Sequence, residues 1–466
     1  MLGAVLTRWT MGSAAAPVAS LWTTELGAEP GEAELRLLAL SGQFLGVAVT
    51  AEPPASLRDL PDIPALALPT VPDPVRPLVR RLLTTTKETR PKIDLLEFLA
   101  TRGWTAHPAD WMPASTDDEI PDVYAPWRDW AEIVASAGTA QQRATDRLTA
   151  ENWPDFWPAA RKVALAELRR RDPPAARTLL EAKFAEESAD ARLRLLGILA
   201  TGLSETDVSF LESIVANDRA PRVRALATSL LARLGLGPVV GEDTSELKGF
   251  FSVQVKGLLR RSRVIQFENA KTPAQRQRRA ALFEAVDIAS LARALGLAPQ
   301  ELIAAWTWEM DSDADHALVA MIARTGADAL VTRAAEAVTQ CDTDDLRGLA
   351  VLAPRLTAGE RSALADKVLR TRRCSFEMAK AIAGGTARLD NPLDAVAGKL
   401  LLEALRDDDA KPSDQLAELY ALGLIASRAG ARQALERLNG AGLLQGDPRL
   451  DMLRLNAALD DNGAKP

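Results

Sequence analysis

The sequence predicts an all-α protein whose short helices pack as hairpins into a row, an α-solenoid, with an irregular proline-rich segment in its N-terminal part. Alanine and leucine dominate the apolar residues, whereas aromatic residues make up only 5% of the 466 and tyrosine occurs twice. Alanine and leucine lose little on entering a helix, and the residues that favour strands are scarce. Apolar stripes at helical spacing, most regular between residues 190 and 235, are the further sign of this fold class.

The N-terminal part divides at a run of prolines. Residues 35–49 predict one apolar helix. Prolines then crowd the following stretch of chain: Pro53, Pro54, Pro61, Pro64, Pro69, Pro72, Pro74 and Pro77. Because a proline in a helix interior removes a hydrogen bond and clashes with the preceding turn, residues 51–77 are predicted to be an irregular connection. The leucines between these prolines should hold it against the surface of the next unit.

Four regions are therefore expected along the chain. They are an N-terminal helical segment (1–50), a proline-rich connection (51–77), a tryptophan-rich helical region with repeats (78–237) and a C-terminal helical-repeat region (238–466). The last boundary follows from a glycine- and proline-containing break at residues 235–243, which separates a regular helical block from a more basic one.

Three helices are predicted between residues 190 and 235. Ser204 and Asp207 form a capping-box pattern at the start of the second helix, where hydroxyl and carboxylate can satisfy orphaned backbone N–H groups. Pro221 suits the first position of the third helix, and Gly235 closes it.

Similar one-sided helices are expected on both sides of this block. Residues 152–170 and 174–184 predict a further pair, and capping patterns at Thr272 and Thr357 mark helix starts in the less regular C-terminal half. A short helix with one apolar face cannot bury that face alone, so antiparallel stacking with its neighbours is expected.

The run DRAPRVRALATSLLARL at residues 218–234 resembles the second half of a HEAT-type repeat, with Asp218, Val223 and Arg224 at the motif positions. Asp172-Pro173 followed by Ala176-Arg177 is a weaker copy. The resemblance implies an α-solenoid of HEAT-like helical hairpins and carries no information about function.

A larger resemblance covers about residues 90–237. It is carried by three runs that occur in order: ATRGWTAHPADWMP, ENWPDFWPAARKVALAELRRRDPPAAR and LLGILATGLSETDVSFLE. This order resembles an uncharacterised bacterial family of HEAT-like proteins whose genes often lie beside MoxR-type AAA+ ATPases and proteins with von Willebrand A domains. The resemblance implies an accessory or scaffold role with such an ATPase system, and that family supplies no catalytic residues.

Charge and cysteine usage restrict the classes of function. The net charge of −7 argues against a general affinity for DNA or RNA, which depends on a basic surface. Cys341 and Cys374 are too few for a disulfide framework and are expected to be reduced thiols. The apolar run at residues 2–6 is interrupted by Arg8 before a signal-peptide core could form, and no stretch is long enough for a membrane span. We therefore expect a cytoplasmic protein without a membrane partner.

Tryptophans are concentrated between residues 104 and 157. Six of the ten lie there: Trp104, Trp111, Trp127, Trp130, Trp153 and Trp157. They could line a groove for a peptide or ligand, because tryptophan brings a large apolar area with one N–H to orient a partner. The favoured alternative is that they fill the seam between an N-terminal domain and the first repeats.

A basic segment follows at residues 256–279. It contains one acid, Glu268, and eight basic residues, so the local charge is 8 − 1 = +7. The basic residues are Lys256, Arg260, Arg261, Arg263, Lys271, Arg276, Arg278 and Arg279. The favoured interpretation is a set of solvated faces paired with nearby acids such as Glu242, Asp243 and Glu246. Docking of an acidic protein partner and contact with nucleic acid are the alternatives.

Several patterns resemble functional motifs but lack the residues that those motifs require. Residues 289–306 have a helix-turn-helix outline, but the second helix offers acids rather than base-reading side chains. Residues 311–315 open like a calcium loop and lack its glycine and final glutamate. His107 and His316 have no metal-ligand spacing and are expected to be capping or surface residues.

No phosphate-binding loop is present, because Gly398-Lys399 lacks its companion glycine and hydroxyl residue. We therefore expect no cofactor, no metal and no enzymatic activity, except for carboxylates that could meet in space, such as those at residues 117–119. The predicted function is a protein-binding scaffold or adaptor; the alternative is a nucleic-acid-associated factor that uses the basic segment.

Overall fold

The computed structural model describes residues 26, 29–48, 62–86, 88–114, 117, 120–135, 148–156, 158–237, 241–256, 262–268, 270, 272–341, 345–371, 374–407, 411–444 and 446–459. The chain divides into two compact units, residues 1–62 and residues 63–466. In the first unit, helix α3 (Pro30–Ala48) confirms the predicted apolar helix and begins five residues earlier than expected, with proline at its first position. Its Leu37 and Ser41 are buried, whereas Leu35 and Leu38 are exposed.

The second unit confirms the all-α fold class. The only strands in the described part of the chain are β1 (Phe251–Lys256) and β2 (Ser262–Phe267), an antiparallel pair in which Phe251 lies opposite Phe267. The sequence interpretation missed this hairpin, because it read the segment only as basic and continued the helical style through it. The signal was the alternation of apolar and polar residues in FSVQVK, which has the period of a strand.

The hairpin is held by aromatic packing at the end where β1 begins and β2 finishes, opposite the connection between the strands. The ring centroids of Phe251 and Phe267 lie 5.2 Å and 4.9 Å from that of Trp306, and Thr307 donates its hydroxyl to the backbone oxygen of Ile265. A two-stranded hairpin is marginal alone, so this contact with a helix end supplies the burial that it needs.

A first helical block has a core of its own. Its helices are α7 (Pro158–Arg171), α8 (Pro173–Lys183), α9 (Ala189–Gly197), α10 (Val208–Asn217) and α11 (Pro221–Arg233). Successive helices pair, α7 with α8 and α10 with α11, and alternate ones also touch, α7 with α9 and α9 with α11. The stripes predicted from the sequence form this core, which includes Leu196, Leu211 and Val223.

Predicted helix ends in this block are confirmed. The backbone N–H of Ser204 donates to the Asp207 carboxylate at 3.0 Å in a capping box, and Pro221 opens α11. Gly202 and Gly235 have φ of +61° and +81°, the left-handed conformation that glycine adopts without strain at a helix end.

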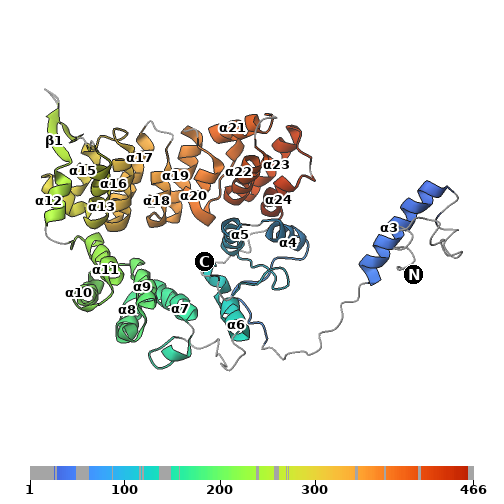
Figure 1. Cartoon of the computed structure of the whole chain (residues 1–466), viewed down its shortest axis with the longest axis horizontal. Helices are drawn as coiled ribbons and strands as arrows, with labels where there is room; N and C mark the ends of the chain where they lie inside the picture. The colour runs from blue at the N-terminus through green and yellow to red at the C-terminus, as the bar shows by residue number, and fades with distance from the viewer. Residues whose placement is uncertain are drawn as a thin grey trace. The chain divides into compact units, whose positions relative to one another are not determined.

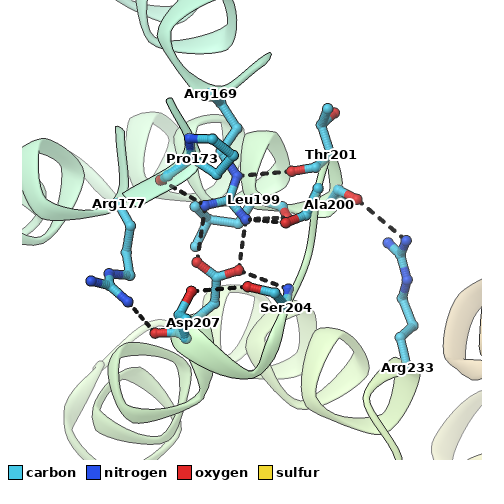
Figure 2. Close-up of polar contacts among 11 residues, drawn as sticks. Arg169, Pro173, Arg177, Leu199, Ala200, Thr201, Ser204, Asp207 and Arg233 are labelled. Atoms are coloured by element: carbon cyan, nitrogen blue, oxygen red, sulfur yellow. Dashed lines mark hydrogen bonds and ion pairs between the residues drawn. The ribbon is translucent and has the colours of Figure 1, made fainter. Parts of the chain in front are cut away.

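Buried polar groups join α7 to the turns that follow it. Figure 2 shows Arg169, which is 1% exposed, donating hydrogen bonds to both carboxylate oxygens of Asp207 and to the backbone oxygens of Pro173, Leu199, Thr201 and Gly202. One guanidinium therefore supplies donors to three carbonyls of the turn that follows α9 and to the first carbonyl of α8.

A second, longer row of helices follows this block in the sequence (Figure 1). Its members are α12 (Glu242–Lys248), α13 (Pro273–Ala285), α14 (Ile288–Ala294), α15 (Pro299–Ala305), α16 (Ser312–Thr325), α17 (Asp328–Gln340), α18 (Arg347–Leu352), α19 (Ala358–Thr371), α20 (Phe376–Ala383), α21 (Val396–Ala404), α22 (Pro412–Ile425), α23 (Arg428–Gly440) and α24 (Asp451–Ala458). Alternate helices touch in the order α16, α18, α20, α22, α24, and α11 joins the row at α16. Thr272 and Thr357 cap α13 and α19 as predicted.

The end of this row is covered by the first helices of the unit. Helix α4 (Arg76–Thr85) packs on α24, and α5 (Thr89–Thr101) packs on α22. Arg102 donates to Asn456 Oδ1 at 2.7 Å, Tyr420 donates to the backbone oxygen of Pro91 at 2.7 Å, and Lys380 pairs with Asp94. Side chains of residues 71–127 and 247–459 thus share one core, although about 120 residues separate the two segments in the sequence.

The described part of the proline-rich connection is irregular, as predicted. Residues 62–75 form no helix or strand, and one bridge joins Thr70 to Thr105. Trp127, on α6 (Ala125–Ala135), donates its indole N–H to the backbone oxygen of Pro64 at 2.9 Å and so fixes the connection to the helices.

Candidate functional site

The tryptophans do not gather at one surface. Trp111, Tyr124 and Trp127 form an aromatic cluster with ring centroids 5.1 Å and 5.5 Å apart, and Trp127 is buried in the larger core. Trp104 is partly buried against the same core, and Trp130 is partly buried on α6.

Trp153 belongs to the other core. Its indole N–H donates to Glu187 at 2.7 Å, and the Arg161 guanidinium lies 5.7 Å from the ring centroid. Trp157 lies outside the described residues. Trp104, Trp111 and Trp127 thus pack in one core and Trp153 packs in the other.

Among the described residues of the basic segment, Arg263, Arg278 and Arg279 pair with acids of the same chain. Arg278 pairs with Glu246 at 2.6 Å and Asp243 at 3.1 Å, as the solvated-face interpretation expected, and the hydrogen bond that Arg278 donates to Glu246 raises the pKa of Arg278. Arg279 is buried and pairs with Asp311 at 2.7 Å. Arg276 is exposed on α13, and Arg260 and Arg261 lie outside the described residues.

The helix-turn-helix outline is a structural hairpin. Helices α14 and α15 meet at Gly296, which has a φ of +71°, and Leu302 and Ile303 of α15 are buried in the core. The exposed side of α15 includes Glu301, which pairs with Arg263 on β2 at 3.3 Å. The helix that would read bases therefore faces the protein with its apolar side and carries an acid on the other.

The acidic run at residues 311–315 forms the N-cap and the first turn of α16. Asp311 caps α16 by accepting from Ala314 N at 3.0 Å. Asp315 accepts from Trp306 Nε1 at 2.7 Å and from Glu309 N at 2.8 Å. Throughout the described chain, no group of three or more His, Cys, Asp or Glu residues could hold a metal ion.

A pocket of about 150 Å³ opens among α16, α17 and α18, and we take it as the candidate site. Its lining comprises Trp308, Glu309, Ser312, Asp315, His316, Val319, Val338, Cys341, Asp345 and Gly348. Val319 and Val338 are 2% and 6% exposed and form its apolar floor, whereas Glu309 is exposed at its mouth. The pocket therefore combines a dry base with a polar, acidic rim.

Asp345 is the best-anchored acid of this rim. Arg347 donates to its two carboxylate oxygens at 2.9 Å and 2.7 Å, and His316 Nε2 lies 3.1 Å from Oδ2. The hydrogen bond from Arg347 is the main cause that lowers the pKa of Asp345 to about 2. Asp345 is therefore held as a carboxylate, and the positive charge of Arg347 balances most of its negative charge.

Asp315 has a different environment. Burial raises the pKa of its carboxyl although the Trp306 and Glu309 N–H groups favour the charged form. The Glu309 residue that donates to it has a φ of +72°, a left-handed conformation that is uncommon for a residue with a side chain. The hydrogen bond to Asp315 holds this turn and sets the Glu309 side chain at the pocket mouth.

Sequence reasoning missed this pocket. His316 was expected to be a capping or surface residue; its side chain is 36% exposed, and it lines the pocket together with Cys341 and Asp345. These residues come from three segments that meet only because α16, α17 and α18 pack together, so no local spacing could reveal them. His107 is partly buried, and its Nδ1 accepts from Ala109 N at 3.1 Å within a turn.

Comparison with known proteins places the chain within a family. The sequence model described as "Family of unknown function (DUF5691)" matches residues 126–450, from α6 to the start of α24. No curated protein and no solved structure matches the chain. No helix in the described ranges is both long and apolar enough to cross a membrane.

Proposed function

Because the chain belongs to the DUF5691 family, whose function is unknown, we propose a function from its architecture: it is a non-enzymatic scaffold that binds another protein along its stacked helical hairpins. The observation that carries the proposal is the row α16, α18, α20, α22, α24, in which each helix contacts its alternate neighbour. Rows of this kind present extended surfaces along one side, and such surfaces suit protein partners.

The use of charged residues supports the same proposal. Buried or half-buried arginines such as Arg169 and Arg355 donate to helix-end carbonyls and to a nearby aspartate, and so stabilise the stack. Arg278 and Arg279, central to the nucleic-acid alternative, are paired with acids of the same chain. The scaffold is therefore favoured over a factor that binds DNA or RNA.

We propose a MoxR-type AAA+ ATPase, or a von Willebrand A-domain protein of the same module, as the partner. Support comes from the sequence resemblance over residues 90–237. The proposal places the protein in the cytoplasm, in keeping with two cysteines that form no disulfide.

The test is co-purification of the tagged full chain from its native cell, with mass spectrometry of what elutes in fixed proportion. The expected result is an ATPase or von Willebrand A-domain protein that rebinds the purified chain in size-exclusion chromatography. A chain that elutes alone and rebinds neither protein contradicts the named partners. Salt-sensitive binding of DNA or RNA at low salt, lost when Arg276 is neutralised, would favour the other class.

A further inference from the structure

We propose that the pocket among α16, α17 and α18 receives a basic side chain, arginine or lysine, from a segment of the partner protein. The inference rests on the proposed scaffold function and specifies how the partner is recognised.

The size and shape of the pocket suit one side chain. A cavity of about 150 Å³ holds a single benzene molecule, so this pocket takes one side-chain end and excludes a second residue. Val319 and Val338 offer an apolar floor for the methylene groups of a long side chain. Trp308 in the wall adds an aromatic face of the kind that attracts ammonium and guanidinium groups.

The charge of the lining selects a cation. Three carboxylates line the pocket, those of Glu309, Asp315 and Asp345, and the lining contains no lysine or arginine. Arg347 balances most of the charge of Asp345 from outside the lining. An incoming cation therefore meets Glu309 and the acceptor sites that Asp315 keeps beside its hydrogen bonds from Trp306 and Glu309 N. An anionic or wholly apolar group would displace the water that solvates these carboxylates without pairing with their charge, so its binding would be unfavourable.

The surroundings favour a protein segment over a free amine. Met310, next to Glu309, is 68% exposed. Val351 is 47% exposed and lies three residues after Gly348 on α18, on the same side of the helix. In a bound protein segment, an apolar residue next to the basic residue could cover Met310 or Val351. A small free cation would leave both of these side chains exposed to water.

The test uses the full chain and short fluorescein-labelled peptides of alanine, leucine and glycine with one central arginine. Matched peptides carry citrulline, which keeps the shape of arginine without its charge. Binding is measured by fluorescence polarisation. Gly348→Leu fills the pocket, and Gly359→Leu is its control because Gly359 on α19 has open space around it. Glu309→Gln removes a rim charge, and Asp313→Asn removes an exposed charge on α16 that lies outside the lining.

We expect the arginine peptide to bind at least about tenfold more tightly than the citrulline peptide, a difference of about 1.4 kcal/mol. Gly348→Leu should abolish this preference and Glu309→Gln should weaken it several-fold, while both controls keep it. If Gly348→Leu melts early, Gly348→Ala replaces it, since an added Cβ would lie at an ordinary 3.5 Å from Val319 Cγ2.

Equal binding of the two peptides, absence of binding to both, or an arginine preference that survives a folded Gly348 variant overturns the proposal. Partner capture separates this outcome from the function itself. If the pocket variants still capture the ATPase-module partner, only the pocket inference fails. If the wild-type chain binds arginine peptides but captures no partner, the named function fails.

Discussion

Arg169 on α7 and Asp207 before α10 form an ion pair of 2.6 Å in which both side chains are almost wholly buried. Thirty-eight positions separate them in the sequence. The Arg169 guanidinium also donates hydrogen bonds to four backbone oxygens, so every N–H of the side chain has an acceptor (Figure 2). Full pairing of this kind is the condition under which a charge can be buried without a large penalty.

Replacing this arginine should be costly. Arg169→Met leaves the Asp207 carboxylate and the helix-end carbonyls without their donor, so we expect a loss of about 3–5 kcal/mol in the free energy of unfolding. Urea denaturation followed by circular dichroism measures it. Arg170→Met is the control, because the neighbouring Arg170 is 57% exposed and its ion pair with Glu167 lies at the surface, so a change within about 0.5 kcal/mol is expected. Equal effects of the two substitutions would contradict the structural role of the buried pair.

Close packing of α22 on α24 predicts a glycine effect. A Cβ at Gly423 would lie 2.7 Å from Met452 Cγ and 2.9 Å from Leu453 N. Gly423→Ala should therefore destabilise by about 1–3 kcal/mol through overpacking, despite the helix preference of alanine. Gly440, the last residue of α23, has open space around it, so Gly440→Ala should be neutral or slightly stabilising. Thermal melts compare the melting temperatures of both variants with that of the wild-type chain. A stabilised Gly423→Ala variant would show that the two helices are not in close contact.

The Asp345 carboxylate predicts a dependence of stability on acid. Its pKa falls from 3.8 to about 2 on folding, mainly through the Arg347 hydrogen bond. A group whose pKa is depressed by folding stabilises the folded state above its unfolded pKa. The stability difference between the wild-type chain and Asp345→Asn should be constant above about pH 5. It should then shrink as the pH falls through about 4 towards 2.

Denaturant titrations at a series of pH values measure this difference. Arg347→Gln is the matched variant, because it removes the cation and keeps the carboxylate. In that background, Asp345→Asn should lose most of its pH-dependent effect. The same pH dependence with and without Arg347 would assign the shift to another group.

The two cysteines should differ in reactivity. Cys374 is buried, and the pKa of its thiol is raised to about 12. Burial is the main cause, and the negative charge of nearby Glu418 is the second. Because the thiolate is the reactive form, iodoacetamide at pH 8 should leave Cys374 unmodified in the folded chain. Cys341 is half-buried beside the pocket and should be alkylated first. Mass spectrometry of the native and urea-unfolded chain checks both rates, and equal modification of the two thiols under native conditions would contradict the burial of Cys374.

Local signals in the sequence predicted helix ends well. The capping box of Ser204 and Asp207, the proline at Pro221 and the glycine at Gly235 act within a few residues of each other, so their effect on the backbone does not depend on distant contacts. The hairpin at residues 251–267 was missed although its alternation is visible, because a strand pair this short gains its stability from Trp306 and Thr307, which come later in the chain.

Composition and helical periodicity by themselves determined the all-α class, the stacking of one-sided helices and many of the helix boundaries, because each follows from short-range chemistry. Tertiary structure alone decided that α5 covers the end of the row through Arg102 and Asn456, 354 positions apart, and that His316, Cys341 and Asp345 line one pocket. These contacts depend on how whole helices pack, and the residues at the packed faces carry no spacing that marks their distant partners.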